Sequence, residues 1–250
     1  MRIKWIIIIP AVLAVTLMVG TGAVTPTIAR AQRVVVVDPG HGGATPGVTG
    51  EAGLSEKQLT HDLAQLIAAQ LRNRYRVVFT RTSDVNVAIE DRTGLANNEK
   101  ATAFISLHAG GSINRTVEGI TLFYYTGGFS DVGASLSAAK LTDTVPATQP
   151  WQRVQIAHRA ASSVLAHRIK TRLEAPPAPS AISVTDAPLR VLMGADMPAV
   201  VIEVGYLTNP LEEKRLMDDS HRSSLARRIA QGIDDFFNTT DTISSTDLNE

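Results

Sequence analysis

The sequence predicts an α/β domain with a single, largely parallel, twisted sheet of about six strands flanked by helices. Three runs of almost entirely apolar residues, at 34–37, 103–107 and 199–204, have the composition of strands that are buried on both faces. Segments with helical periodicity separate them, and this alternation is typical of parallel α/β sheets. With 250 residues and 44% hydrophobic residues, the chain can build one sizeable core, and we find no internal repeat or second domain.

The remaining elements follow in chain order. A helix is expected over 55–73, because its leucines recur on one face and because Ser55 and Gln58 have the spacing of a capping box. The other expected elements are a strand at 77–80, a helix at 91–100, a strand at 119–125, a loop at 127–150, a helix at 151–173, a short strand at 189–192, a short helix capped by Asn209 and opened by Pro210, a helix at 220–237, and a flexible polar tail at 238–250.

Charge and cysteine content exclude several classes of protein. The 24 basic and 24 acidic residues cancel, so no general attraction to nucleic acid or to an anionic membrane is expected. Cysteine is absent, which excludes a disulfide framework, a thiol nucleophile and a cysteine-ligated metal. Any metal site must therefore consist of His, Asp or Glu side chains.

The first 31 residues have the pattern of an export signal. Arg2 and Lys4 precede an uncharged stretch from Trp5 to Ala29, and Ala29-Arg30-Ala31 has the small-x-small spacing of a signal peptidase site. The stretch is also long enough for a membrane anchor, but polar residues interrupt it and no linker precedes the first strand. We expect a signal peptide at 1–31, with an N-terminal anchor as the alternative, and an exported domain over 32–237.

Ionisable residues lie at the ends of the three most apolar strands. His41 follows the first strand, His108 follows the second, and Glu203 ends the third. In open α/β sheets, functional sites form beyond the carboxyl ends of the strands. Each residue alone could be a hydrogen-bonded structural residue, but together they indicate a metal or acid–base site. Two histidines and one carboxylate are a standard ligand set for catalytic zinc, and other divalent metals also fit.

The third protein ligand stays open at this stage. Glu51, Glu56 and Asp62 all lie in the right region of the chain. Glu56 is in the first turn of the 55–73 helix, where the helix dipole alone would favour a carboxylate. Sequence spacing does not decide between these three residues.

Six motifs in a fixed order carry a family resemblance. They are Val36–Gly43, Glu56-Lys57, Thr80–Asp84, Asp91-Arg92 with Ala96-Asn97, Ile105–Ala109, and Met197–Asn209. Together they resemble the zinc-dependent N-acetylmuramoyl-L-alanine amidases, the amidase type 3 cell-wall hydrolases, and the resemblance extends from about residue 33 to 237. It implies that His41, Glu56 and His108 bind one Zn²⁺ ion and that Glu203 is the catalytic carboxylate. It further implies hydrolysis of the amide between N-acetylmuramic acid and L-alanine of peptidoglycan, in the periplasm or cell wall.

The chain departs from the family pattern at Gly110, where Asn or Asp is usual. Residues 151–188 are too few for the inserted helix that blocks the site in some relatives, so no built-in plug is expected.

Two alternative functions remain: a weak or inactive amidase-like protein that binds the wall, and a zinc carboxypeptidase that acts on stem peptides. The expected partners are peptidoglycan and muropeptides, with no nucleic acid and with a membrane only through an uncleaved N-terminus; an activating protein is not identified.

Other polar residues have structural explanations. Arg81, Asp84 and Arg92 are at least as well explained by ion pairs that stabilise the fold as by substrate contacts. Asn209 is expected to cap a helix rather than to bind a ligand. Tyr124 is expected to pack in the core.

Overall fold

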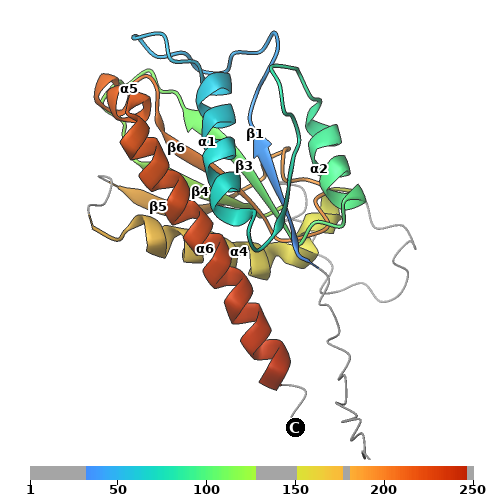
Figure 1. Ribbon diagram of the computed structural model, residues 1–250. Helices are drawn as coiled ribbons and strands as arrows, with labels where there is room; N and C mark the ends of the chain where they lie inside the picture. Colours follow the sequence, from blue (N-terminus) through green and yellow to red (C-terminus); the bar gives the residue numbers. More distant parts are fainter. Residues whose placement is uncertain (1–31, 128–150, 177–180, 247–250) are drawn as a thin grey trace, which may run out of the picture. The chain divides into compact units, whose positions relative to one another are not determined.

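The computed structural model describes residues 32–127, 151–176 and 181–246 (Figure 1). The expected export signal at 1–31, nearly all of the expected loop at 127–150, and residues 247–250 lie outside the described residues. Among the helices of the described part, none is both long and apolar enough to cross a lipid bilayer.

Six strands form one sheet in the order β2–β1–β3–β6–β4–β5. They are β1 (Val34–Pro39), β2 (Arg76–Phe79), β3 (Ala103–Gly110), β4 (Ile120–Tyr125), β5 (Ile182–Ala187) and β6 (Ala199–Tyr206). β2, β1, β3 and β6 pair in parallel. β4 runs antiparallel to β6 and pairs in parallel with β5. The predicted α/β fold with a largely parallel sheet is therefore confirmed.

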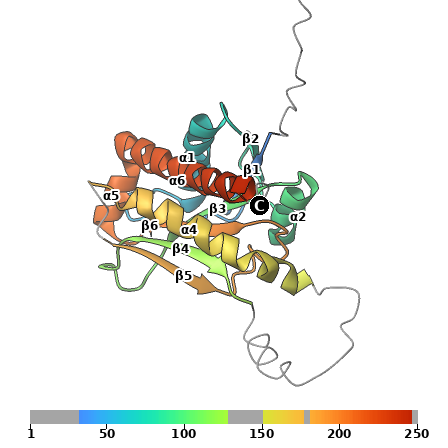
Figure 2. The same ribbon diagram turned by 90° about the horizontal axis from the view of Figure 1, so that it is seen from below.

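Helices cover both faces of this sheet (Figures 1 and 2). α1 (Glu56–Leu71), α4 (Arg159–Leu173) and α6 (Asp219–Thr246) enclose the larger apolar cluster on one face. α2 (Ile89–Asn98) and the segment 189–197 enclose the smaller cluster on the other. A 3₁₀ helix, η1 (Trp151–His158), precedes α4, and α5 (Pro210–Met217) follows β6.

The first strand shows why the apolar runs lack alternation. Val35 and Val37 belong to the larger cluster, whereas Val34 and Val36 belong to the smaller one. Because successive side chains of a strand point to opposite faces, a strand between two helical layers needs apolar residues at every position. β3 and β6 show the same pattern, and because β1, β3 and β6 pair in parallel, their carboxyl ends and the polar residues there lie at one edge of the sheet.

The strand expected at 189–192 is wrong. These residues form turns, with the N–H of Leu192 bonded to the carbonyl of Leu189, and they are apolar because Leu192 is fully buried in the smaller cluster. The strand in this region is β5, at Ile182–Ala187. It lies at the edge of the sheet, and only its alternate residues Ile182 and Val184 pack on the core.

Two other boundaries differ from the prediction. The helix expected over 151–173 begins as η1 and becomes α-helical only at Arg159. The last helix continues beyond Phe237 to Thr246, so most of the expected tail is helical. Ser55 makes no hydrogen bond to the backbone of α1, so the predicted capping box does not form, whereas the Asn209 side chain does accept bonds from the N–H groups of Leu211 and Glu212.

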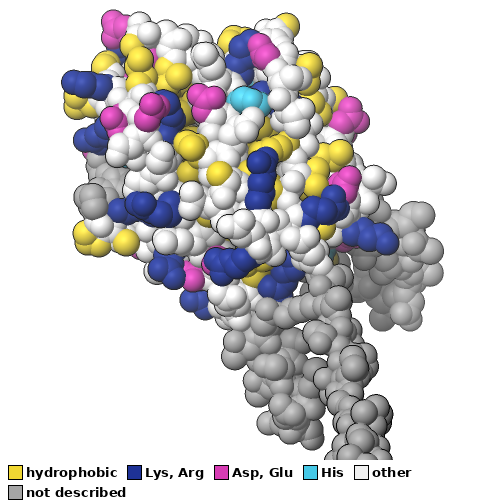
Figure 3. All heavy atoms as spheres, in the orientation of Figure 1, with side chains coloured by type: hydrophobic (Ala, Val, Ile, Leu, Met, Phe, Trp, Pro, Cys, Tyr) yellow, Lys and Arg dark blue, Asp and Glu magenta, His cyan; other side chains and the backbone are white. Residues whose placement is uncertain are grey.

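Figure 3 shows Lys and Arg side chains interspersed with Asp and Glu side chains over the face that α1 and α6 form. This mixture of signs agrees with the net charge of +0.

Candidate metal centre

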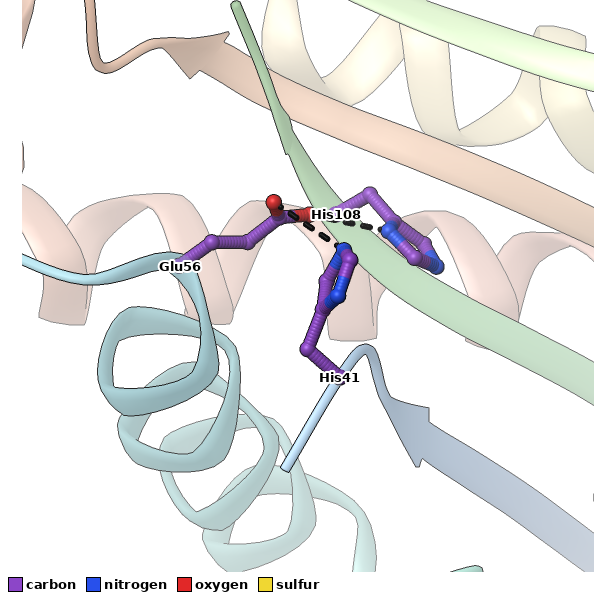
Figure 4. Close-up of side chains that lie close together, drawn as sticks. All are labelled: His41, Glu56 and His108. Atoms are coloured by element: carbon purple, nitrogen blue, oxygen red, sulfur yellow. Dashed lines mark hydrogen bonds and ion pairs between the residues drawn. The ribbon is translucent and has the colours of Figure 1, made fainter. Parts of the chain in front are cut away.

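The side chains of His41, Glu56 and His108 meet at the edge of the sheet (Figure 4). Nε2 of His41 lies 3.1 Å from Oε2 of Glu56, and Nδ1 of His108 lies 2.9 Å from Oε1. One potential ligand atom from each residue lies within 4.8 Å of the other two, so the three side chains could hold a metal ion. The imidazole centroids are 5.3 Å apart, with the rings inclined at 75°.

Three different elements supply these residues. His41 comes from the loop after β1, Glu56 opens α1, and His108 lies near the end of β3. Glu56 is buried, with 3% of its side chain exposed, whereas the side chains of His41 and His108 are 33% and 25% exposed. The cluster is therefore anchored in the protein and open to solvent on one side, as a catalytic rather than a closed structural metal site requires.

Two buried arginines hold the loop that carries His41. Arg81 donates from Nε to the carbonyl of Pro39 (3.0 Å) and from Nη2 to that of Gly40 (3.0 Å). Arg92 donates from Nη1 to the carbonyl of Pro39 (2.9 Å) and from Nη2 to that of His41 (3.2 Å). His41 has a φ of 58°, which is uncommon for a residue with a side chain. The two guanidinium groups compensate for this conformation by fixing the loop carbonyls.

Asp38 completes the network beneath the loop. Its carboxylate is fully buried and accepts hydrogen bonds from Arg92 Nη1 (2.6 Å), Thr80 Oγ1 (2.5 Å) and Ser106 Oγ (2.7 Å). The ion pair between Asp38 and Arg92 is therefore part of the fold, the first of the two explanations considered for Arg92.

Asp84 has a related role on the surface. It accepts a hydrogen bond from the Lys57 ammonium (2.7 Å) and one from the N–H of Gly43 (2.7 Å). The bond from Lys57, followed by that from Gly43, lowers the pKa of Asp84. The pair ties α1 to the glycine-rich loop after β1.

The environment of Glu56 keeps its carboxylate ionised. Burial alone would raise its pKa, but hydrogen bonds from His108, His41 and the N–H of Ala109 together lower that pKa far below the usual value. The N–H groups of Val48 (2.9 Å) and Ala109 (3.0 Å) each donate to one carboxylate oxygen. An ionised, oriented carboxylate beside two imidazoles is the form in which such a group binds a cation.

Two glycines let the backbone approach this cluster. A Cβ atom at Gly47 would lie 2.4 Å from Oε2 of Glu56, and one at Gly40 would lie 2.6 Å from Cε1 of His108. Gly47 also has a φ of +70°. Any side chain at either position would displace one of the three clustered residues.

Glu203 lies beside the cluster on β6. It is the register partner of His108 in the parallel β3–β6 pair, so the two side chains point to the same face of the sheet. Burial raises the pKa of Glu203, the charge of His108 lowers it, and the charge of Glu56 raises it. Within the part of the chain that the structure describes, its carboxylate accepts no hydrogen bond. An unpaired, half-buried carboxylate is costly to the fold, which indicates a functional role.

The structure separates the three acidic residues that spacing left open. Glu56 alone among them contacts the two histidines. Glu51 forms an ion pair with Arg115, and Asp62 is exposed on α1. The roles of His41, Glu56 and His108 as metal ligands, and of Glu203 as the catalytic carboxylate, stay predictions.

The structure also gives a physical reason for Gly110. A Cβ atom at this position would lie 2.7 Å from the ring of Tyr206, which covers the strand at this point. An Asn or Asp side chain would fit here only if the Tyr206 ring moved. The α-helix described within 151–188 is α4, which packs on β4 and α6 and so forms part of the core. Tyr124 is half-buried against the larger apolar cluster, in agreement with its predicted packing role.

An α/β sheet that brings two histidines and two carboxylates to one strand edge defines a candidate metal-dependent hydrolase. The chain belongs to the N-acetylmuramoyl-L-alanine amidase family, whose model matches residues 35–235. This confirms the family that the sequence motifs resemble.

Individual relatives agree with this assignment. N-acetylmuramoyl-L-alanine amidase AmiA of Salmonella typhimurium is 29% identical over 225 residues, which cover 82% of this chain and 76% of that protein. The sporulation-specific N-acetylmuramoyl-L-alanine amidase of Bacillus subtilis is 32% identical over 216 residues, covering 84% and 71% of the two chains. The solved catalytic domain of the amidase CwlV from Bacillus (Paenibacillus) polymyxa has a TM-score of 0.67 at 26% identity and covers 83% of this chain and 99% of that one. These relatives support a peptidoglycan amidase activity.

Proposed function

We propose that this protein is a zinc-dependent amidase that cleaves the amide between N-acetylmuramic acid and L-alanine in peptidoglycan. The observation that carries the proposal is the Glu56 carboxylate bonded to the imidazoles of His41 and His108, with Glu203 on the neighbouring strand. Family membership supports the choice of substrate.

The residues of the cluster fit a zinc ion. His41, Glu56 and His108 would hold it through two nitrogens and one carboxylate oxygen, a ligand set that leaves a position for water or substrate. Zinc bound there supplies Lewis acidity, which polarises an amide carbonyl and lets water lose a proton near neutral pH. The partial exposure of both histidines leaves that position accessible.

Glu203 supplies the proton transfer. With no hydrogen-bond donor on its carboxylate among the described residues, Glu203 is available to accept a proton from the attacking water. Its raised pKa makes it a stronger base than an ordinary glutamate and, once protonated, an acid that can deliver the proton to the leaving L-alanine nitrogen. Amines leave only when protonated, so one residue that accepts and then donates the proton satisfies both halves of the reaction.

The proposed chain organisation places this reaction outside the cytoplasm. Residues 1–31 would be the export signal, and residues 32–237 the catalytic domain that reaches the periplasm or cell wall. Phe236 and Phe237 of α6 are buried, which supports including the chain up to residue 237 in the catalytic core.

The test is incubation of the purified protein with muropeptides, with and without a chelator, followed by mass spectrometry of the products. A peptide with a free N-terminal L-alanine that appears only when zinc is present supports the proposal. Cleavage inside the stem would instead identify a carboxypeptidase, and bound zinc without any cleavage would identify a wall-binding protein.

Two variants assign the residue roles. Glu203→Gln is expected to lower kcat by about 10²–10⁴-fold, the range typical of a lost general base, and to retain stoichiometric zinc. His108→Ala is expected to lose zinc as well as activity, because it removes one of three ligands. Loss of zinc from Glu203→Gln would contradict the division of roles.

A further inference from the structure

A cleft of about 340 Å³ is formed by two loops, 49–51 and 112–115, together with Thr208. This volume is at the lower end of the range for small-molecule sites. The N–H of Ser112 donates to Oγ1 of Thr208 (3.0 Å), so the floor of the cleft is fixed to the segment after β6. None of these residues belongs to the candidate metal centre.

The residues that line the cleft are linked to that centre by short segments of the chain. Val48, which precedes the first cleft loop, donates its N–H to Oε2 of Glu56 (2.9 Å). Its side chain lies against Gly111, which precedes the second loop. Ser112 is four residues after His108, and a chain spans at most about 3.6 Å per residue, so the cleft begins within roughly 14 Å of His108. A stem peptide of three or four residues has a similar extended length.

An exposed ion pair stands in the cleft. Nη2 of Arg115 is bonded to Oε2 of Glu51, and the two side chains are 52% and 66% exposed. Arg115 is also oriented by a bond from Nε to the carbonyl of Thr208 (3.3 Å), whereas its Nη1 makes no hydrogen bond to any residue in the described part. Ion pairs this exposed are weak, so another carboxylate could replace Glu51 at small cost. Ile113, fully exposed on the same loop, offers an apolar surface beside the guanidinium.

We propose that this cleft binds the stem peptide of the substrate and that Arg115 takes a carboxylate of the stem in place of Glu51. A guanidinium with two free or exchangeable N–H groups matches the two oxygens of a carboxylate. Ile113 packs on the aliphatic part of the same stem. The inference rests on the proposed amidase function and adds to it a preference for stems whose carboxylates are free.

The test compares synthetic N-acetylmuramoyl peptides that differ only in one carboxylate. One probe carries all stem carboxylates free, a second has the α-carboxylate of the second stem residue amidated, and a third has the C-terminal carboxylate amidated. The protein is expected to cleave one of the amidated probes with kcat/KM lower by about tenfold or more, mainly through KM, because a charge-assisted pair is lost. The probe that is cleaved with the lower kcat/KM identifies the carboxylate that Arg115 binds.

Variants then locate the preference. Arg115→Gln is expected to raise KM for the free probe to that of the disfavoured probe without changing kcat, whereas Glu51→Gln removes the competing carboxylate and is expected to lower KM for the free probe. Arg76→Gln is the control, because Arg76 forms a partly exposed ion pair with Glu99 (2.6 Å) at the opposite edge of the sheet, and this variant should retain the full preference. Thermal unfolding checks that each variant is folded.

Equal cleavage of all three probes by the unmodified protein would overturn the inference while leaving the amidase function intact. Retention of the preference by folded Arg115→Gln would also overturn it. Failure of the unmodified protein to cleave any probe in the presence of zinc would refute the proposed function itself, and this inference with it.

Discussion

Replacing Asp38 with asparagine tests whether the buried network beneath the candidate metal centre stabilises the domain. Asp38 is fully buried, and its two oxygens accept hydrogen bonds from Arg92, Thr80 and Ser106. The substitution keeps the size of the side chain but removes the charge that compensates the Arg92 guanidinium. It also turns one acceptor into an NH₂ group, which must then face a donor.

The expected loss of stability is large. Breaking a buried ion pair by removing one partner costs about 3–5 kcal/mol, because the remaining charge is left buried without compensation. A domain of this size loses about 2–4 °C of Tm per kcal/mol, so Tm should fall by roughly 10 °C. Since Arg92 also bonds the carbonyl of His41, zinc affinity should fall by about 10–100-fold, the usual effect of disturbing the support of a ligand.

Urea unfolding and zinc titration measure both effects. Glu99→Gln is the control, because it breaks an exposed ion pair with Arg76 at the other edge of the sheet and should cost about 1 kcal/mol or less. A loss below about 1 kcal/mol for Asp38→Asn, with an unchanged urea m-value, would refute the idea that this pair is required by the fold.

Three further substitutions probe other contacts. Gly47→Ala places a methyl group against Oε2 of Glu56 at a φ of +70°, so zinc content measured by atomic absorption should fall while the far-ultraviolet circular dichroism is retained. Glu213→Ala removes the buried carboxylate that accepts hydrogen bonds from the N–H groups of Ala52 and Leu54 in the loop before α1, and it should cost about 1–3 kcal/mol in urea unfolding. The pKa of Asp235 is lowered chiefly by its hydrogen bond from Arg172, so this pair stabilises the fold above about pH 4 and its contribution disappears as the pH falls through the lowered value. Arg172→Ala should therefore lower stability by about 0.2–1 kcal/mol at pH 7 and by less at pH 2.5, and an equal loss at both values would contradict the assigned pair.

The central strands could be predicted because nearly all of their residues are buried and apolar. Val34–Val37 contains no polar residue, and most positions of β3 and β6 are apolar as well. The sequence does not predict β5, because an edge strand buries only alternate side chains, and it wrongly predicts a strand at 189–192 because the residues of this buried turn are equally apolar. A short apolar run therefore indicates that a segment is buried but does not distinguish a strand from a turn.

The site could be predicted only in part from the residues themselves. The ends of buried strands pointed to His41, His108 and Glu203, since parallel strands share an edge. Choosing Glu56 over Glu51 and Asp62 depended on the family resemblance, because the direction of a side chain at a helix start is not encoded in spacing. The Glu51–Arg115 pair joins residues 64 positions apart, and such a contact depends on how two loops fold over the sheet.

The placement of β6 between two hydrogen-bonded neighbours has a consequence for how this protein can be controlled. Glu203 is fixed across from His108 on one side and Thr121 on the other, so the spacing between the proposed proton acceptor and the proposed ligand His108 is set by the pairing of the strands. Under the proposed mechanism, these two residues are therefore aligned without closure of a loop. Control of the proposed activity through substrate entry would leave this alignment unchanged.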